Sequence, residues 1–282
     1  MIEKAAETQT RGGITSGIQK DTLVSKTIAY IWRQLPAWRD DPYRKYEQSE
    51  NKLNLQLVKF LDARARCDFP MVRFDHQEYQ SGRRTVDISA SSVETVTIGA
   101  KLHTIYDAIL VIEGKRLPAP SLDREKEYVS GGKDNASGGI QRFKLGLHGG
   151  DHNTVAMVGY VQERSLSQWH NQINDWIAKF EQGVFEDSCD WSAGEKLDVF
   201  EEDSLNGVAS YRSVHSRVGS VKNKRIELHH LWIEMNLNKH ENQGTGGYRG
   251  RNDLNGHLEY GGTSALFFSM FQLVFLNFLF QS

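Results

Sequence analysis

Apolar positions recur with a helical period in the first part of the chain. Residues 21–36 carry apolar side chains three and four positions apart, with Asp21 as the expected N-cap and Leu35-Pro36 as the expected end. A second helix is expected over 46–66, where Ser49 is a candidate N-cap for the main part. Each segment therefore presents one apolar face.

The pattern then changes to the period of strands. Apolar residues within 72–79 and 86–88 flank the turn Gln80-Ser81-Gly82-Arg83, which predicts a β-hairpin, and 93–98 alternates as a further strand. Residues 106–112 (YDAILVI) form a continuous apolar run, which is typical of a strand covered on both faces.

The second half of the chain alternates helices with strands. Residues 116–139 are polar and contain two prolines and four glycines, so we interpret them as a long surface loop. The remaining expected elements are helices over 138–146 and 165–182 and strands over 155–161, 208–217 and 226–235. This order predicts an α/β fold, a sandwich with a central mixed β-sheet flanked by helices.

Composition divides the chain into four parts. Residues 1–40 are interpreted as a polar lead-in with the first helix, 41–236 as the main domain, and 237–262 as a Gly- and Asn-rich loop. Residues 263–282 are almost continuously apolar. Three interpretations of this tail stay open: a buried helix or strand pair, a segment that docks on a partner chain or a membrane, and a segment that is not native to the fold.

Charge and cysteine usage narrow the classes of function. The formal net charge is −2, so a nucleic-acid partner would have to be met by local positive charge. Cys67 and Cys189 lie far apart, which argues against a cysteine zinc site and fits a cytoplasmic location. The phosphate-loop pattern fails after Lys133 because Asp134 follows it, and no G-x-S-x-G hydrolase motif occurs.

The histidines form no recognisable metal motif. His148 and His152 lie in the glycine-rich segment HGGDH, and the chain contains no H-E-x-x-H sequence. We therefore interpret a loop histidine such as His148 as a solvated residue. His229 and His230 would face opposite sides of one strand, and one of them is interpreted as simply packed.

The charged residues that follow the apolar run carry the candidate chemistry. Glu113 and Lys115 lie two residues apart at the end of the expected strand, so their side chains should point to one side. Placing a carboxylate and an amine there costs desolvation energy unless they serve each other or a ligand. Asp87 is the lone acidic residue of an apolar-alternating strand, and pairing of the two strands would bring it beside Glu113.

Two adjacent carboxylates repel each other unless a cation lies between them. Asp87 and Glu113 therefore predict a Mg²⁺ site, in which Mn²⁺ should substitute, because Mg²⁺ prefers oxygen ligands and also takes phosphate oxygens. A metal held in this way lowers the pKa of a bound water and neutralises charge on the leaving group. Lys115 would position or help to deprotonate the attacking water and stabilise the pentacovalent phosphate.

Asp87, a strand and then Glu113-x-Lys115 resemble the D…(D/E)-x-K signature of the PD-(D/E)XK nuclease superfamily. The proline of that name is absent, since Val86 precedes the aspartate. The resemblance covers residues 46–180 and implies a restriction-endonuclease-like sandwich. The motif is short, so its weight comes from the apolar strand that precedes E-x-K and from the agreement in helix order.

The resemblance implies further site residues. Members of the family commonly place a glutamate on the first helix, facing the metal, and Glu50 matches it, with Glu47 as the alternate one turn earlier. Gln141 matches the polar residue on the helix after the E-x-K strand and would orient the reacting groups. Basic residues expected to contact nucleic acid are Arg83, Arg84, Arg116, Arg142 and Lys144. A hairpin tip solvated by arginines is the alternative for the first two.

The expected activity is that of a metal-dependent endonuclease that hydrolyses phosphodiester bonds in DNA, with RNA as the alternative substrate. Such domains commonly serve bacterial restriction or phage defence. The competing hypothesis is a non-catalytic subunit whose nuclease-like core binds nucleic acid or a partner protein. A homodimer is a further option, and a membrane contact is expected only if residues 263–282 insert.

Overall fold

The computed structural model describes residues 23–79 and 84–236. The expected N-cap Asp21, the predicted turn 80–83, and the loop and apolar tail over 237–282 lie outside the described residues.

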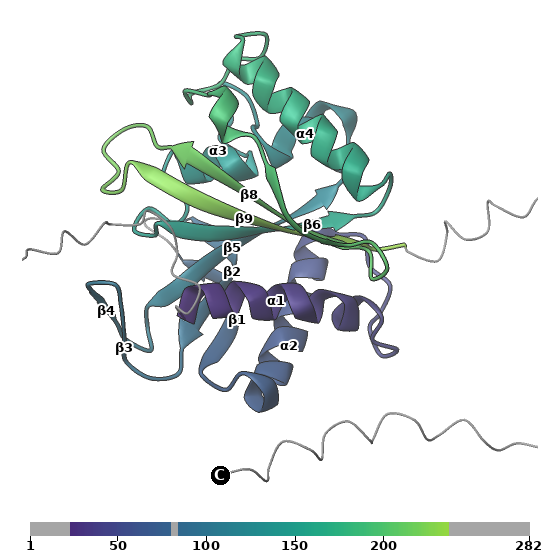
Figure 1. The fold of residues 1–282 in the computed structure, drawn as a ribbon, viewed down its shortest axis with the longest axis vertical. Coiled ribbons are helices and arrows are strands. Elements are labelled where there is room, and N and C mark those ends of the chain that lie inside the picture. Colours follow the sequence, from purple (N-terminus) through teal and green to yellow (C-terminus); the bar gives the residue numbers. More distant parts are fainter. Residues whose placement is uncertain (1–22, 80–83, 237–282) are drawn as a thin grey trace, which may run out of the picture. The chain divides into compact units, whose positions relative to one another are not determined.

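A seven-stranded mixed sheet forms the centre of the fold, in the order β1-β2-β5-β6-β9-β8-β7 (Figure 1). The β5–β6 and β6–β9 pairs are parallel, and the other pairs of this sheet are antiparallel. The strands are β1 Val72–Tyr79, β2 Thr85–Ser92, β5 Ala108–Leu117, β6 Thr154–Val161, β7 Asp198–Asp203, β8 Val208–Ser216 and β9 Arg225–Glu234, with β3 Val96–Ile98 and β4 Lys101–His103 as a separate hairpin. The predicted α/β class with a mixed sheet is confirmed.

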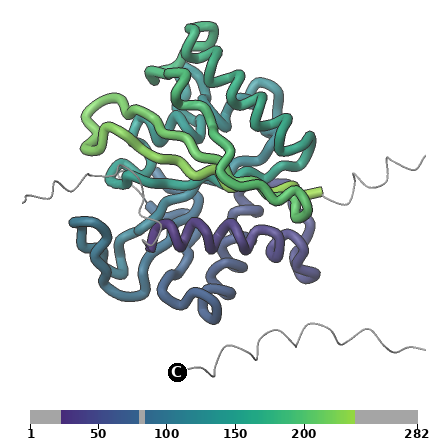
Figure 2. The backbone as a smooth tube through the Cα atoms, in the orientation of Figure 1, coloured from purple at the N-terminus to yellow at the C-terminus, as the bar shows by residue number. Residues whose placement is uncertain are grey.

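Helices cover both faces of the sheet. The helices of one face come from the N-terminal part of the chain and those of the other from its second half, as the colours in Figure 2 show. The first face carries α1 (Leu23–Arg39) and α2 (Glu50–Asp68), and the second carries the 3-10 helix η1 (Leu122–Tyr128), α3 (Gly139–Lys144) and α4 (Leu166–Glu181), with η2 (Ala193–Glu195) beside β8. Within the described ranges, no helix has the length and apolar composition needed to cross a membrane.

The expected end of the first helix at Leu35-Pro36 is wrong. Pro36 lies inside α1, which continues to Arg39. Proline removes one helical hydrogen bond, but Leu35 and Trp38 are fully buried, and the Trp38 ring packs on Tyr160 of β6 at 5.7 Å. Burial of the last turn therefore outweighs the local preference to stop.

Two expectations about the middle of the chain also need correction. β5 does not end at the E-x-K motif but runs on to Leu117, because Glu113 and Lys115 stay in register with β6. The segment 116–139 is not simply a surface loop, since it contains η1 and buries Tyr128 and Val129 in the core. The strand β7 was not expected because its residues lie exposed on an edge, where no buried face imposes alternation.

A chain of buried polar side chains crosses the layer between the sheet and η1. His230 bonds the Tyr128 hydroxyl through Nδ1 at 2.9 Å and the Ser213 hydroxyl through Nε2 at 2.7 Å. The same Ser213 oxygen bonds His215 Nε2 at 2.7 Å. His229, the neighbour of His230, is buried as well, so both histidines of the pair are packed.

Lys144 lies at the far end of this series of buried polar side chains, which continues from His215 Nδ1 to Glu195 Oε2 at 3.4 Å. Its ammonium group donates to Glu195 Oε2 at 2.5 Å and lies 4.5 Å from the Trp191 ring centroid. Lys144 is fully buried, so it is not available to a phosphate, contrary to the sequence expectation. The spacing of apolar residues along the sequence could not reveal that Lys144 is buried, because its partner Glu195 lies 51 residues away.

Acid should destabilise the protein partly through His230. Burial, followed by the charges of His215 and His229, holds the pKa of His230 well below its ordinary value, so the unfolded chain takes up a proton where the folded one does not. The free energy of unfolding should fall below about pH 6.5, by up to about 1.4 kcal/mol per pH unit from this residue. Urea unfolding of wild type and His230→Gln, compared between pH 7.5 and 5, isolates that contribution. An NMR titration with an ordinary pKa for His230 would contradict it.

Candidate active site

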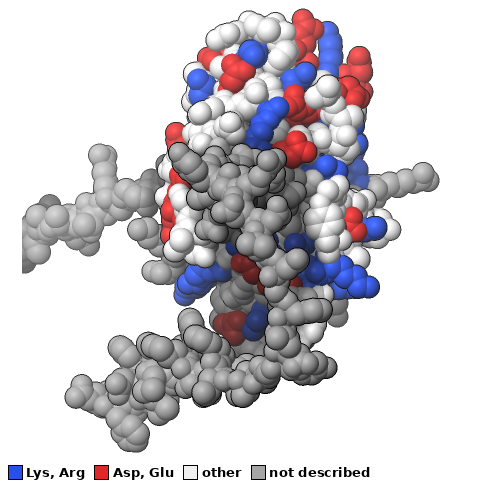
Figure 3. Space-filling model, turned by 90° about the vertical axis from the view of Figure 1, so that its right-hand side faces the viewer, with Lys and Arg blue, Asp and Glu red and all other residues white. Residues whose placement is uncertain are grey.

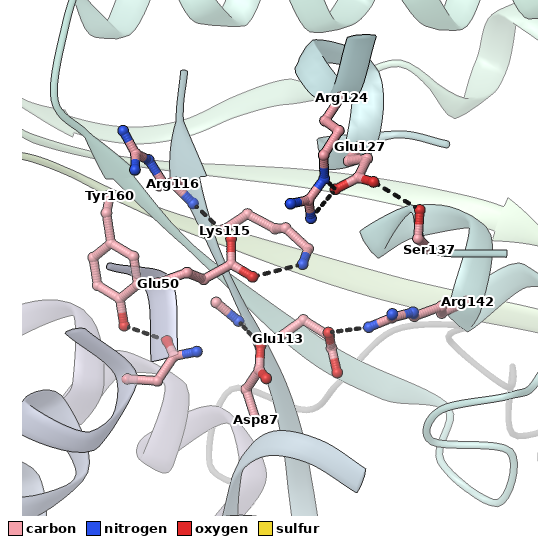
Figure 4. A network of polar contacts seen from close by, with 12 residues as sticks. Glu50, Asp87, Glu113, Lys115, Arg116, Arg124, Glu127, Ser137, Arg142 and Tyr160 are labelled. Atoms are coloured by element: carbon pink, nitrogen blue, oxygen red, sulfur yellow. Dashed lines mark hydrogen bonds and ion pairs between the residues drawn. The ribbon is translucent and has the colours of Figure 1, made fainter. Parts of the chain in front are cut away.

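Strand pairing brings the two predicted carboxylates together. β2 pairs with β5 so that Ile88 lies opposite Ile112, and the next residues along are Asp87 and Glu113. The backbone N–H of Gly114 donates to Asp87 Oδ2 at 3.0 Å. Figure 4 shows the two carboxyl groups beside each other on neighbouring strands, so the predicted juxtaposition is confirmed.

The start of α2 adds a third carboxylate. Glu50 Oε1 accepts from Lys115 Nζ at 2.9 Å, and Glu50 Oε2 accepts from the backbone N–H of Arg116 at 3.2 Å. Glu47 instead accepts from the backbone N–H of Ser49, the N-cap position of α2, at 3.0 Å. Of the two glutamates considered from the sequence, Glu50 is therefore the one that lies in the cluster.

Glu113 is completely buried and bonded at both oxygens. His148 Nδ1 donates to Oε1 at 2.5 Å, and Arg142 Nη1 donates to Oε2 at 3.3 Å. The interpretation of His148 as a solvated loop residue is wrong, since its side chain is buried against this carboxylate. Sequence spacing carried no signal for the contact, because 35 residues separate the pair.

The charges in the cluster are strongly coupled. Burial of the carboxyl, with the charges of Glu113 and Glu50 beside it, raises the pKa of Asp87 to about 7. Burial alone would raise the pKa of Glu113, but the hydrogen bond and charge of His148, with Lys115 and Arg142, hold it below its usual range. Burial opposes the charge on Lys115, yet the surrounding carboxylates raise its pKa. Glu113 is therefore ionised and Lys115 protonated at neutral pH.

Asn54 packs against the backbone of the E-x-K motif from the α2 side. It is fully buried, and its Oδ1 accepts from the Tyr160 hydroxyl at 2.7 Å. A Cβ on Gly114 would stand 1.9 Å from that Oδ1, so only glycine fits between Glu113 and Lys115. Asn54 follows Glu50 by one helical turn, and this spacing on one helix face was the available signal for a residue that the sequence reading missed.

Gln141 hydrogen-bonds the loop before α3, and not the carboxylates or the lysine of the cluster. Its Oε1 accepts from the backbone N–H of Gly131 at 3.0 Å and of Gly138 at 3.3 Å, and its Nε2 donates to the carbonyl of Gly132 at 2.9 Å. Its role is to shape the glycine-rich loop that precedes α3.

Glu127 forms a further polar group on the η1 side of the cluster, which the sequence reading missed. It accepts from Arg124 at 2.7 Å and from the Ser137 hydroxyl at 2.9 Å (Figure 4). Burial alone would raise the pKa of Glu127, but the hydrogen bonds from Arg124 and Ser137 and the charge of Arg124 lower it. The charge of Lys115 lowers this pKa further. The carboxylate of Glu127 on η1 therefore interacts electrostatically with Lys115 of the cluster.

The predicted nucleic-acid contacts fall into different environments. Arg84 is exposed and Arg116 is partly buried, with its Nε donating to the carbonyl of Pro118 at 3.1 Å. Arg142 lies at Glu113, and Arg83 lies outside the described residues. On the uncovered part of the surface in Figure 3, basic and acidic side chains are interspersed.

The carboxylates of Asp87 and Glu113 suit Mg²⁺ better than Zn²⁺. Among residues 23–79 and 84–236, no three or more His, Cys, Asp or Glu side chains are arranged as a metal cluster, which argues against a closed zinc site there. Mg²⁺ needs fewer protein ligands, since one or two carboxylates suffice and waters complete its shell. Asp87 and Glu113 supply that number. Burial is the main cause of the raised pKa of Asp87, and the charge of Glu113 beside it adds a repulsion that a cation would relieve.

Comparison with known proteins finds no match among protein-family models, curated proteins or solved structures.

Alanine at position 114 should disrupt the cluster. The new Cβ would collide with the Asn54 amide, which cannot move without losing its bond to Tyr160. We expect Gly114→Ala to lower the free energy of unfolding by about 1–3 kcal/mol. Urea unfolding measures this, with Gly194→Ala as the control, because a Cβ there meets nothing within 4 Å.

The double variant Asn54→Ala/Gly114→Ala checks the cause. Removing the amide should relieve the collision, so the double variant should be less destabilised than the sum of the single ones. Additive losses would show that the collision is not the source.

Proposed function

We propose that this protein is a metal-dependent nuclease that hydrolyses phosphodiester bonds, with DNA as its substrate. The observation that carries the proposal is the convergence of Asp87, Glu113 and Lys115 on two adjacent strands, with Glu50 joining from α2. Three carboxylates and a buried ammonium in one place are costly for stability, and phosphoryl transfer is a chemistry that uses such a set.

The order of elements supports the same proposal. α2 is followed by the antiparallel strands β1, β2 and β5, then by α3 and the parallel strand β6. This is the order that a resemblance to the PD-(D/E)XK superfamily implies, with the E-x-K residues on the central strand of the unit. The restriction or defence role that such domains commonly have is part of the proposal.

Asp87 and Glu113 are the residues that would hold Mg²⁺. When bound, the ion would activate water and neutralise negative charge on phosphate oxygens. Glu50 was expected to face the metal as well, but its two oxygens bond Lys115 and the Arg116 backbone, so we assign it to orienting the lysine.

Lys115 supplies fixed positive charge. Because its pKa is raised by the carboxylates around it, it stays protonated, which favours stabilising the pentacovalent phosphate over deprotonating water. Arg142 adds a second cation at Glu113, and its side chain is 28% exposed, so part of it is accessible to a substrate. The site thus places two cationic donors next to the carboxylate pair.

Cleavage assays test the chemistry and its site together. Wild type should cut plasmid and linear DNA with Mg²⁺ or Mn²⁺ and not with EDTA, and Lys115→Met should lower the rate at least about 100-fold. Lys179→Met is the matched control, since this lysine pairs with Asp175 on α4 away from the cluster.

The outcomes separate the hypotheses. Equal cutting by wild type and Lys115→Met would show that the site is wrong. A wild type that binds DNA but neither cuts it nor binds Mn²⁺ would overturn the enzyme in favour of a non-catalytic binding subunit. Cutting of RNA alone would correct the substrate.

Binding measurements should distinguish exposed from buried basic residues. Arg84→Ala should weaken DNA binding in EDTA and reduce the slope of log K against log salt by about one, because one phosphate contact is lost. Lys144→Met should leave that slope unchanged and lower the melting temperature, because Lys144 is buried with Glu195. Arg64→Ala, exposed on α2, serves as the surface control.

A further inference from the structure

The loop between α3 and β6 contacts the proposed active site through His148. It contains His148, whose Nδ1–H donates to Glu113 Oε1 while the ring meets the Phe143 ring edge-on at 6.4 Å. Both His148 and Glu113 are buried, so solvent does not compete for this hydrogen bond. The orientation of Glu113 therefore depends on where the loop holds the histidine.

Arg217, directly after β8, holds that loop. Its guanidinium donates to four backbone carbonyls: Phe143 at 3.1 Å, Gly149 at 2.6 Å, Gly150 at 3.2 Å and His152 at 3.0 Å. Among the described residues, no carboxylate lies within ion-pair distance of Arg217, although the side chain is buried. Burial lowers its pKa to about 10, so the group keeps its charge at neutral pH.

The fold leaves the loop little freedom around these contacts. Gly149 has φ +58, and a Cβ there would stand 2.9 Å from Val111 of β5, so the chain passes directly over the sheet. The backbone N–H of Val218 donates to the carbonyl of Lys144 at 3.1 Å, which ties the residue after Arg217 to the end of α3. Burying a cation against three carbonyls of the loop and one of α3 is costly unless the position of the loop matters.

We propose that His148 and Arg217 are positioning residues for the carboxylate of Glu113. Arg217 fixes the loop, and His148 fixes the carboxylate so that Oε2 faces Arg142 and the side where a divalent cation would enter. The consequence for cation binding rests on the proposed function, whereas the mechanical link from Arg217 through His148 to Glu113 does not.

Mn²⁺ affinity of the full chain is the first readout. Hydrogen-bond partners of metal-ligating carboxylates change metal affinity by about 10- to 100-fold, so calorimetric titration should show such a loss for His148→Leu. His148→Asn, which keeps a donor near the position of Nδ1, should recover most of the affinity. Arg217→Met should also bind Mn²⁺ more weakly, although it touches neither carboxylate.

A double variant identifies the route of the effect. Because Arg217 acts through His148, His148→Leu/Arg217→Met should bind no more weakly than His148→Leu alone. Arg212→Met on the same β8 strand is the control, since Arg212 pairs with Glu227 and should leave affinity unchanged. Wild-type affinity in both single variants, or losses that add, would overturn the proposal.

An NMR readout needs no metal. The Nδ1–H proton of His148, assigned by its loss in His148→Leu, should be observed as a slowly exchanging resonance in wild type and in Arg212→Met. It should be lost or exchange-broadened in Arg217→Met, with folding checked by circular dichroism; if that variant does not fold, Arg217→Lys takes its place. An unchanged resonance would overturn the link.

The two readouts keep the proposals separate. A wild type that binds no Mn²⁺ while the His148 resonance depends on Arg217 would overturn the metal-dependent function and support the positioning link. Mn²⁺ binding that is insensitive to both residues would support the metal site and overturn the effect of His148 and Arg217 on cation affinity.

Discussion

A carboxylate buried in the central strand of a sheet has to be neutralised where it stands, and much of this structure follows from that constraint on Glu113. The side chain is inaccessible to water, and its oxygens accept from His148 and Arg142. An unpaired charge at this depth would cost several kcal/mol. The α3 helix and the loop after it are therefore held in place around one side chain.

The same strand joins the two layers of the fold. On one side, α2 brings Glu50 to Lys115 and places Asn54 over Gly114. On the other side, α3 and its following loop reach Glu113. The E-x-K motif lies inside β5 and not at its end, so both helical layers contribute side chains to one cluster. The stability of the fold and the geometry of the cluster are consequently coupled at this point, since loosening either layer would move a charged group.

Local patterns predicted the elements well where burial repeats regularly along the chain. The helices α1, α2 and α4 and the strands β5, β6, β8 and β9 correspond to predicted segments, because each has an apolar face or run. The predictions were wrong where distant packing overrides local preference. Pro36 stays helical because Trp38 is buried on β6, and the segment around Tyr128 is drawn into the core by its contacts with β9.

By itself, the sequence determined the α/β class and the placement of the charged side chains of the candidate site. Glu113 and Lys115 share a strand face because strand geometry alternates, and Asp87 stands out because charge is rare in an apolar strand. Only the tertiary structure decided that His148 bonds Glu113, and that Lys144 is buried with Glu195. The physical reason is that periodicity reports which face a residue occupies, whereas its partner comes from a segment tens of residues away that only the folded chain brings near.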